Sequence, residues 1–308
     1  RRQRQMCIRD SNKPQHSSLN PAGLFHLFIV YLIWGSTYLA IRVGVRPGAG
    51  FTPLMLGVYR VVTAGAILLI WSLLTKQRTS LSKKELLWLF ISGQLFWLGG
   101  NGLVMVGEQR ADSGVAALII ATTPIWVATI NALVTRTAPA WNLIVSWMIG
   151  TGGIIVLSMP AILSGVHADL ISIFALNLAA ISWAGGTVLQ NKRPSNLTPT
   201  VQSGYQLLFG GVGFLILALI FREPVPQPVP EAWIAWAYLV IFGSIVAFTS
   251  YIQALRKLPT NLVTTYSYVN PIIAVMLGRI ILKETITIWT VTGAVSYTHL
   301  TLPTIYSV

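Results

Sequence analysis

Apolar stretches of roughly 20 residues recur along the whole chain, and this is the length that a helix needs to cross the hydrocarbon core of a bilayer. We predict ten such spans, at about residues 24–44, 52–74, 86–107, 113–134, 142–162, 170–190, 201–221, 232–255, 262–282 and 286 onward. Because backbone polar groups in lipid must be paired within the protein, the spans are predicted to be helices. The sequence therefore predicts an all-α membrane protein.

The composition excludes an ordinary soluble domain. Hydrophobic residues make up 54% of the chain and charged residues only 9%, whereas soluble domains carry roughly 25% charge. The formal net charge of +13 comes from basic residues that lie singly or in small groups between apolar runs. That pattern is typical of membrane-protein loops, so we expect a lipid bilayer as a partner and no nucleic acid. Cys7 is the only cysteine, which excludes an intrachain disulfide or a cysteine-based metal site, and we expect no metal and no cofactor.

The two ends of the chain differ in character from the spans. RRQRQMCIRDS at the start and VSYTHLTLPTIYSV at the end resemble translated sequencing-adapter read-through. We therefore expect residues 1–20 to be a disordered, non-native tail and residues 296–308 to be non-native. The tenth helix is then expected to be truncated.

Lys and Arg in the loops predict the orientation. With the N-terminus inside, the cytoplasmic loops hold nine basic residues: Lys76, Arg78, Lys83, Lys84, Arg136, Lys192, Arg193, Arg256 and Lys257. The outer loops hold five: Arg42, Arg46, Arg110, Arg222 and Lys283. The positive-inside rule then favours a cytoplasmic N-terminus.

Two of the apolar stretches resemble each other. Residues 117–136 and 264–283 each have a proline near the middle, Pro124 and Pro271, with polar residues just before it. Proline removes a backbone N–H and clashes with the carbonyl four residues back, so we predict a hinge at each. A kinked polar segment in two halves of an apolar chain is typical of a transporter site at a repeat interface.

Further pairs extend this repeat. Trp34-Gly35-Ser36-Thr37 matches Trp183-Ala184-Gly185-Gly186, and Thr52-Pro53 with Tyr59 matches Thr198-Pro199 with Tyr205, all at offsets close to 147 residues. Five spans separate the copies, so the second enters the membrane in the opposite sense. We predict two inverted five-helix repeats around a central cavity, over residues 21–165 and 166–295.

These residues carry a family resemblance. IWGSTYLAIRVGV (residues 33–45), Asn101-Gly102 followed by SGVAALIIATTP (113–124), and YSYVNPIIAVMLG (266–278) resemble the EamA family of the drug/metabolite transporter superfamily, in its YedA-like branch. The resemblance implies ten helices in two inverted halves. It also implies export of small metabolites or amino acids from the bacterial inner membrane. Many members carry Glu after the fourth and ninth helices; here Glu284 keeps the second position, and Arg136-Thr137 occupy the first.

Polar and aromatic side chains inside the spans are the candidates for a substrate cavity. We predict a cavity lined by Trp34, Tyr38, Arg60, Asn101, Thr122, Thr123, Trp183, Tyr205, Tyr251, Tyr266 and Asn270.

Each candidate also has a purely structural interpretation. Trp34 and Tyr38 share a helix face, and either line the cavity or pack against other helices. Arg60 either holds a substrate carboxylate or bonds backbone carbonyls. Asn101 and Tyr251 are better suited to helix-to-helix hydrogen bonds.

The last candidates flank the two prolines. Tyr266 and Asn270 share a face and either orient a polar substrate or, through Asn270, satisfy the backbone freed by Pro271. Thr122 and Thr123 either face the cavity or bond back to their own helix.

Acidic residues are absent from the middle of every predicted span. Glu108, Asp112 and Glu284 all lie near span ends, so a carboxylate proton relay is not expected. No catalytic or P-loop signature is found, so we predict neither an enzyme nor direct use of ATP. The sequence favours a transporter that exports small organic solutes by alternating access. An antiporter of phosphorylated or sugar metabolites and an intramembrane enzyme acting on lipid-linked substrates are the alternatives.

Overall fold

The computed structural model describes residues 20–138, 167–193 and 195–292, together with isolated positions between 141 and 156. Every regular element in these residues is helical. Eight helices or helix runs are long and apolar enough to cross a membrane: Pro21–Val45, Pro53–Leu74, Lys83–Gly107, Ser113–Thr135, Leu170–Lys192, Pro199–Ile220, Pro230–Lys257 and Thr260–Leu282. They correspond to spans one to four and six to nine of the sequence prediction. Most of span five lies outside the described residues, as do residues 1–19 and 293–308, and span ten is described only up to residue 292.

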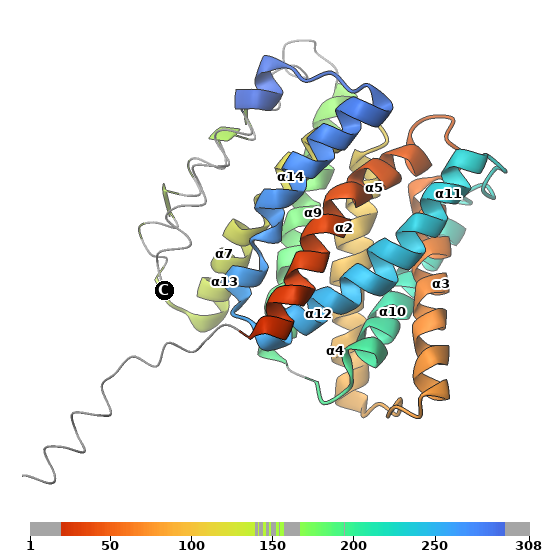
Figure 1. Ribbon diagram of the computed structural model, residues 1–308, viewed down its shortest axis with the longest axis vertical. Coiled ribbons are helices and arrows are strands. Elements are labelled where there is room, and N and C mark those ends of the chain that lie inside the picture. The colour runs from red at the N-terminus through yellow and green to blue at the C-terminus, as the bar shows by residue number, and fades with distance from the viewer. Residues whose placement is uncertain are drawn as a thin grey trace, which may run out of the picture.

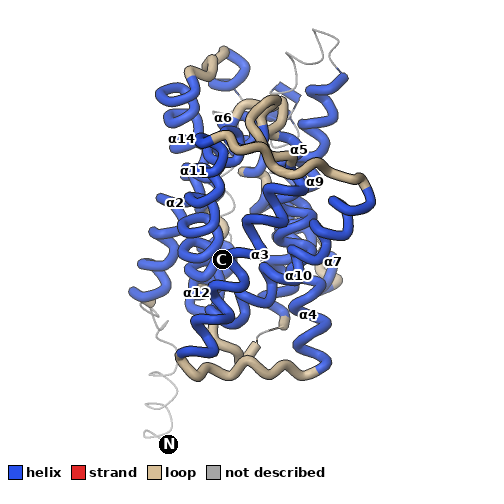
Figure 2. The backbone as a smooth tube through the Cα atoms, turned by 90° about the vertical axis from the view of Figure 1, so that its right-hand side faces the viewer, coloured by secondary structure: helices blue, strands red, loops and turns tan. Residues whose placement is uncertain are grey.

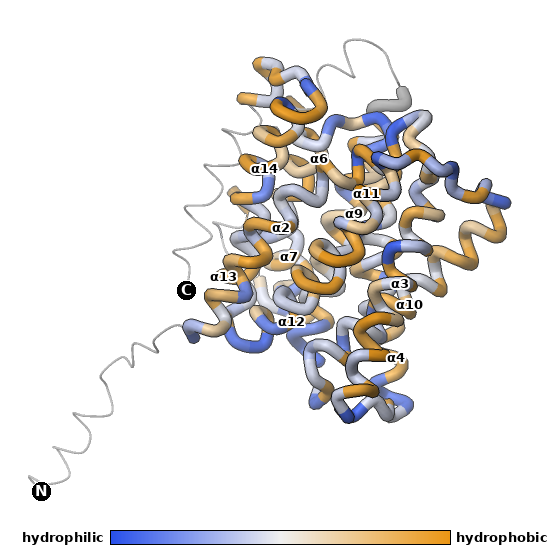
Figure 3. Tube along the Cα trace, turned by 45° about the vertical axis from the view of Figure 1, so that its right-hand side comes forward, coloured by the Kyte–Doolittle hydropathy of each residue, from blue (hydrophilic) through white to orange (hydrophobic). Residues whose placement is uncertain are grey.

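The bundle exposes apolar side chains and buries polar ones. Phe25, Trp71 and Leu219 are 62%, 58% and 69% exposed, whereas Arg60 and Gln206 are 2% and 0% exposed. Hydrophilic residues gather at the two ends of the helices (Figure 3). This distribution suits a solvent that is apolar around the middle of the helices and aqueous at their ends. The chain is therefore a multi-pass helical membrane protein.

Two helices begin in the same way and pack on each other. Thr52 Oγ1 accepts from Met55 N (3.3 Å) ahead of α3 (Pro53–Leu74), and Thr198 Oγ1 accepts from Val201 N (3.3 Å) ahead of α10 (Pro199–Ile220). A threonine N-cap followed by proline is a strong helix-start signal.

The two helices lie side by side (Figure 1). A Cβ added at Gly57 of α3 would lie 2.5 Å from the ring of Phe214 in α10, so glycine is what allows this close approach.

The third and eighth spans each contain a π-helical segment. The third consists of α4 (Lys83–Gly93), η1 (Gln94–Gly102) and α5 (Leu103–Gly107), and the eighth of α11 (Pro230–Tyr238), η2 (Leu239–Val246) and α12 (Ala247–Lys257). π-Helical turns are rare and frequently found at functional sites. Both segments lie at the middle of their spans, where the buried polar residues are.

The fourth and ninth helical runs are interrupted at threonine pairs. The fourth is divided into α6 (Ser113–Ile120) and α7 (Thr123–Thr135), and the ninth span into α13 (Thr260–Val263), α14 (Tyr266–Leu277) and the π-helical η3 (Gly278–Leu282). At each break the threonine hydroxyls donate to carbonyls three residues back: Thr122 to Ile119 (2.8 Å), Thr123 to Ile120 (2.6 Å), Thr264 to Asn261 (3.0 Å) and Thr265 to Leu262 (2.6 Å).

The prolines stand differently in the two runs. Pro124 lies in the first turn of α7, directly after the break, where its missing N–H costs nothing. Pro271 lies inside α14, well past the break at Thr264 and Thr265. The interruption in the ninth span therefore differs from the expected hinge at Pro271, because threonine hydroxyls compete for the backbone carbonyls earlier in the helix.

Two long helices each pack against several other elements (Figures 1 and 2). The helix α2 (Pro21–Val45) packs against α11, α12 and α14, and α9 (His167–Lys192) packs against α5, η1, α6 and α7. The candidate site lies where these two helices meet η1 and α14.

Candidate functional site

A small, partly open cavity of about 50 Å³ lies between α2, α9, η1 and α14. Space for one water is roughly 10–15 Å³ on this measure, so the cavity has room for a few water molecules. Its lining comes from α2, α3, η1, α5, α6, α9 and α14: Trp34, Thr37, Tyr38, Ile41, Arg60, Trp97, Gly100, Asn101, Val104, Ile120, Ala179, Trp183, Tyr266 and Asn270. Seven of the eleven side chains predicted from sequence are in this lining, namely Trp34, Tyr38, Arg60, Asn101, Trp183, Tyr266 and Asn270.

Arg60 enters the cavity wall from α3. Its Nε donates to Ser244 Oγ (2.8 Å), its Nη1 donates to Asn101 Oδ1 (3.1 Å), and its guanidinium lies 5.2 Å from the ring centre of Trp97. A Cβ on Gly243 would come within 3.1 Å of Nη2, so glycine there makes room for the guanidinium.

Arg60 has no ion-pair partner. Within the described residues the ion pairs are Arg42–Asp112 and Arg78–Glu85. The positive charge of Arg60 is therefore buried with hydrogen bonds to two neutral groups only, and several of its five N–H donors remain free for another acceptor.

An aromatic wall stands beside Arg60. The ring of Trp34 lies 5.2 Å from that of Trp183, 5.0 Å from that of Tyr251 and 5.0 Å from that of Tyr266. Trp34 is held in place by its Nε1, which donates to the carbonyl of Gly243 (3.2 Å). Such a wall can stack on organic groups and attract a cation through the ring faces.

Two polar atoms of the lining have no partner among the described residues. Nε1 of Trp97 and Oδ1 of Asn270 are buried without a hydrogen bond. Buried polar groups normally find a partner, and a cavity wall is where a water or a bound solute can provide it. The wall thus offers a free donor on Trp97 beside Arg60 and a free acceptor on Asn270.

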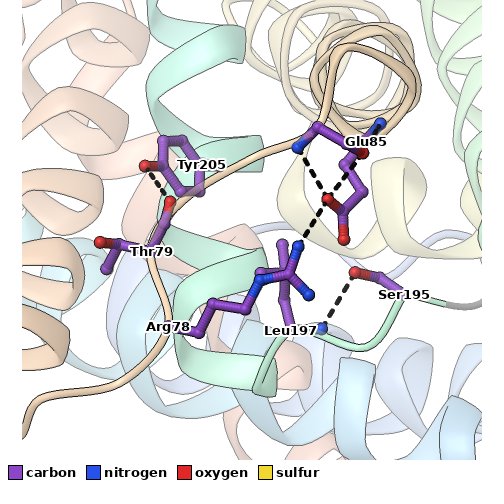
Figure 4. A network of polar contacts seen from close by, with 7 residues as sticks. Arg78, Thr79, Glu85, Ser195, Leu197 and Tyr205 are labelled. Carbon is purple, nitrogen blue, oxygen red and sulfur yellow. Dashed lines mark hydrogen bonds and ion pairs between the residues drawn. The ribbon is translucent and has the colours of Figure 1, made fainter.

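The other four predicted residues lie outside the lining. Thr122 and Thr123 are buried, and their hydroxyls bond back to their own helix as described above. Tyr251 lies one layer behind the wall, with its hydroxyl 2.6 Å from Thr187 Oγ1. Tyr205 lies elsewhere: its hydroxyl donates to the carbonyl of Thr79 (2.8 Å) in the loop between α3 and α4 (Figure 4).

Glu108, which the sequence places near a span end, is fully buried. It is 0% exposed, and neither carboxyl oxygen has a hydrogen-bond partner. Burial raises the pKa of this carboxyl well above its usual range, Arg42 opposes the rise, and Glu284 adds to it. Glu108 thus lies at the end of the third span, as the sequence predicts, and is buried there. Its spacing from Trp97, Asn101 and Val104 puts it on the cavity-lining face of the third span, and that signal could have found it.

Three segments that are distant in the sequence meet around Glu108: the end of α2, the start of α6 and the residues that follow η3. Arg42 Nη1 donates to the carbonyl of Glu108 (2.6 Å), and its Nη2 lies 3.9 Å from Asp112 Oδ1. Glu284 accepts from Ser113 N (3.1 Å) and Ser113 Oγ (2.8 Å). Because a carboxylate is favourable at a helix N-terminus, Glu284 links the end of the ninth span to the start of α6.

Glu108→Gln is expected to make the protein less sensitive to alkali. The folded protein holds a proton on Glu108 that the unfolded chain releases above the ordinary pKa of 4.5. The stability associated with this proton is present below that pH and is lost as the pH rises through the raised pKa. The melting temperature of purified wild type should therefore fall from acidic to alkaline pH. Each kcal/mol lost from the free energy of unfolding lowers it by roughly 2–4 °C, and Glu108→Gln should show a smaller fall. Glu231→Gln, at an exposed position, is the control, and an equal pH dependence in all three proteins would contradict a buried proton.

Known proteins are similar over nearly the whole chain. The sequence profile of the EamA-like transporter family matches residues 21–159 and 170–297. The chain is 35% identical over 264 residues to the uncharacterized inner membrane transporter YedA of Escherichia coli strain K12, covering 84% of this chain and 83% of that one. It is 26% identical to the protein PecM of Dickeya dadantii, covering 83% of each chain. A solved structure titled "Crystal structure of protein" shares the fold with a TM-score of 0.65 and 18% identity, covering 93% of this chain and 98% of that one.

Proposed function

Because this chain belongs to the EamA-like transporter family, we propose that it exports small organic metabolites or amino acids across a bacterial inner membrane by alternating access. The family is one of transporters, so the chain is a transporter and not an enzyme. The direction of transport, the substrate class and the mechanism are the proposal. The inner membrane is the location named for the relative YedA, and the loop charges favour a cytoplasmic N-terminus.

The observation that carries the substrate class is Arg60. A buried arginine with free donors and no ion-pair partner is costly unless another acceptor completes its hydrogen bonds. Its planar fork matches a carboxylate, which can accept two parallel N–H bonds. A carboxylate bound to Arg60 would also bring an acceptor oxygen to the wall that contains the free Nε1 of Trp97.

The opposite part of the wall suits an amino group. Asn270 offers a free acceptor, and the aromatic rings of Trp34 and Tyr266 can attract an ammonium. A carboxylate held by Arg60 and an ammonium held near Asn270 together describe an amino acid. The cavity of about 50 Å³ is too small for most amino acids, so the helices must separate to admit one.

Two inverted repeats would give the helices a way to separate. The pairing of α2 with α12 and α14 has its counterpart in the pairing of α9 with η1 and α7. Each half also contains a Thr-Pro helix start, a π-helical segment in the middle of its third span (η1 and η2) and a threonine break. These correspondences support ten helices in two inverted halves, over residues 21–165 and 166–295, that rock about the central cavity. The segments next to Pro124 and Pro271 would bend as they do so.

Exchange of phosphorylated metabolites is the second candidate. Arg60 is the single cationic side chain among the described residues that line the cavity. One positive charge suits a monoanionic carboxylate better than a phosphate with nearly two charges. The cavity thus favours amino acids or similar monoanions over phosphorylated substrates.

The test is metabolite release from bacteria that express the protein. We expect a solute to be enriched outside cells with the intact protein and not outside cells with Asn270→Ala at equal membrane abundance, because Asn270 supplies the free acceptor. Asn131→Ala, at an exposed position of α7, is the matched control and should release the solute normally. Equal release by Asn270→Ala and Asn131→Ala would refute the assignment of Asn270, and an unchanged extracellular profile with the intact protein would refute export.

A further inference from the structure

A second and larger cavity, of about 290 Å³, opens at the end of the bundle that the loop charges predict to be cytoplasmic. It lies between the start of α4, the end of α9 and the start of α10. No residue is shared with the lining of the central cavity. Its volume approaches the size of typical small-molecule sites, which start near 300 Å³.

Positive charge dominates this second cavity. Lys84, Lys192 and Arg193 line it, and Glu85 is the single carboxylate in the lining. Glu85 Oε2 accepts from Ser82 N (2.9 Å), Ser82 Oγ (2.8 Å) and Arg78 Nη2 (3.1 Å), as Figure 4 shows in part. The charge of Glu85 is therefore committed to the capping box of α4 and to Arg78. Neither ion pair of the described residues includes Lys84, Lys192 or Arg193.

Buried donors in the same cavity lack acceptors. Gln202 is 1% exposed, its Oε1 accepts from Arg256 Nη2, and its Nε2 has no partner. The bond from Arg256 fixes the amide so that the NH2 group is the free end. Nε1 of Trp88 is likewise buried without a partner, and the guanidinium of Arg193 lies 4.8 Å from the ring centre of Trp88. Unlike the exposed lysines, these two donors cannot turn to water.

We propose that this cavity binds a small oxyanion, either a carboxylate or a phosphate, held by Lys84, Lys192, Arg193 and the free amide of Gln202. Five donor groups of the lining lack an acceptor among the described residues, and the one carboxylate is already engaged, so a multidentate anionic acceptor completes the site. The oxyanion can belong to a soluble anion or to the headgroup of an anionic lipid that reaches the cavity from the membrane surface. The chemistry of the cavity is the same for both sources.

The test uses inorganic phosphate and phosphatidylglycerol as probes of the purified full chain. Phosphate binding in a zwitterionic detergent is measured by calorimetry, and retention of phosphatidylglycerol by native mass spectrometry. Lys84→Gln and Arg193→Gln should each weaken phosphate binding by roughly tenfold, the usual loss for one charge-assisted hydrogen bond. Lys83→Gln is the matched control, because Lys83 is the exposed neighbour of Lys84 and does not line the cavity.

The outcomes distinguish a soluble oxyanion from a lipid headgroup, and they also show when the proposal fails. Phosphate binding that falls in Lys84→Gln and not in Lys83→Gln supports a soluble oxyanion. Retention of phosphatidylglycerol that falls in Lys84→Gln alone, without phosphate binding, supports a lipid headgroup. Equal loss in Lys83→Gln and Lys84→Gln would show only a surface charge effect and overturn the site, as would no binding of either probe. Melting temperatures of all variants confirm that the protein remains folded.

Discussion

Arg60→Ala is expected to abolish export while leaving the protein in the membrane. Arg60 supplies the only cation of the described cavity lining, and its free N–H donors have no other acceptor among the described residues. Removing one member of a buried, hydrogen-bonded charge pair costs roughly 3–5 kcal/mol, so the affinity for a carboxylate substrate should fall at least 100-fold. The measurement is release of the exported solute, normalised to the membrane abundance of each variant.

Two controls separate substrate binding from a general loss of charge. Arg60→Lys keeps the positive charge, but three N–H donors without a planar fork cannot bond Ser244, Asn101 and both oxygens of a carboxylate at once, so it should restore export only in small part. Arg222→Ala removes an arginine from an exposed position and should export normally. Full export by Arg60→Ala, or full rescue by Arg60→Lys, would contradict a carboxylate held by the guanidinium fork.

The helices of this protein are predictable because the bilayer imposes a length and a polarity on each span. The second span is predicted at 52–74 and observed as Pro53–Leu74, and the seventh is predicted at 201–221 and observed as Pro199–Ile220. Thr-Pro at each start marks the boundary, since the threonine caps the helix and the proline fits its first turn. Such local signals lie entirely in the sequence of the span.

The irregular parts of the helices are less predictable. The π-helical segments η1 and η2 have no distinctive amino-acid composition, because the widening of the helix depends on the neighbouring helices that pack against it. In the ninth span, proline is the stronger signal in sequence, yet the break lies at Thr264 and Thr265. A threonine hydroxyl competes with the backbone N–H for the same carbonyl, and tertiary packing decides which of the two bonds forms.

The candidate site was predictable where a helix face repeats. Trp34 and Tyr38 are four residues apart, as are Tyr266 and Asn270, and all four line the cavity. Tyr205 was expected there because it matches Tyr59 in the repeat, but repeated sequence does not guarantee an equal environment. Its helix brings it to the loop at Thr79 instead. Glu108 shares a helix face with Trp97, Asn101 and Val104, which places it toward the cavity, but its contact with Arg42 joins distant parts of the chain and is not visible in the local sequence.

Thiol labelling inside the cavity is expected to give an all-or-none contrast. Cys7 is the only cysteine of the chain, so Cys7→Ser gives a background without thiols. Thr37→Cys then places a thiol of similar size in the cavity wall, where Thr37 is 6% exposed. Ala180→Cys is the matched control, because Ala180 is 0% exposed and next to the lining residue Ala179, but does not line the cavity itself.

The most direct test of the cavity as a transport pathway is the rate at which a small, membrane-impermeant thiol reagent modifies these two cysteines from each side of the membrane. If the halves alternate, the cavity opens to each side in turn, so Thr37→Cys should react from outside and from inside while Ala180→Cys stays unmodified. A substrate that occupies the cavity should slow the reaction of Thr37→Cys. Equal rates for Thr37→Cys and Ala180→Cys, or no reaction of Thr37→Cys from either side, would contradict transport through this cavity.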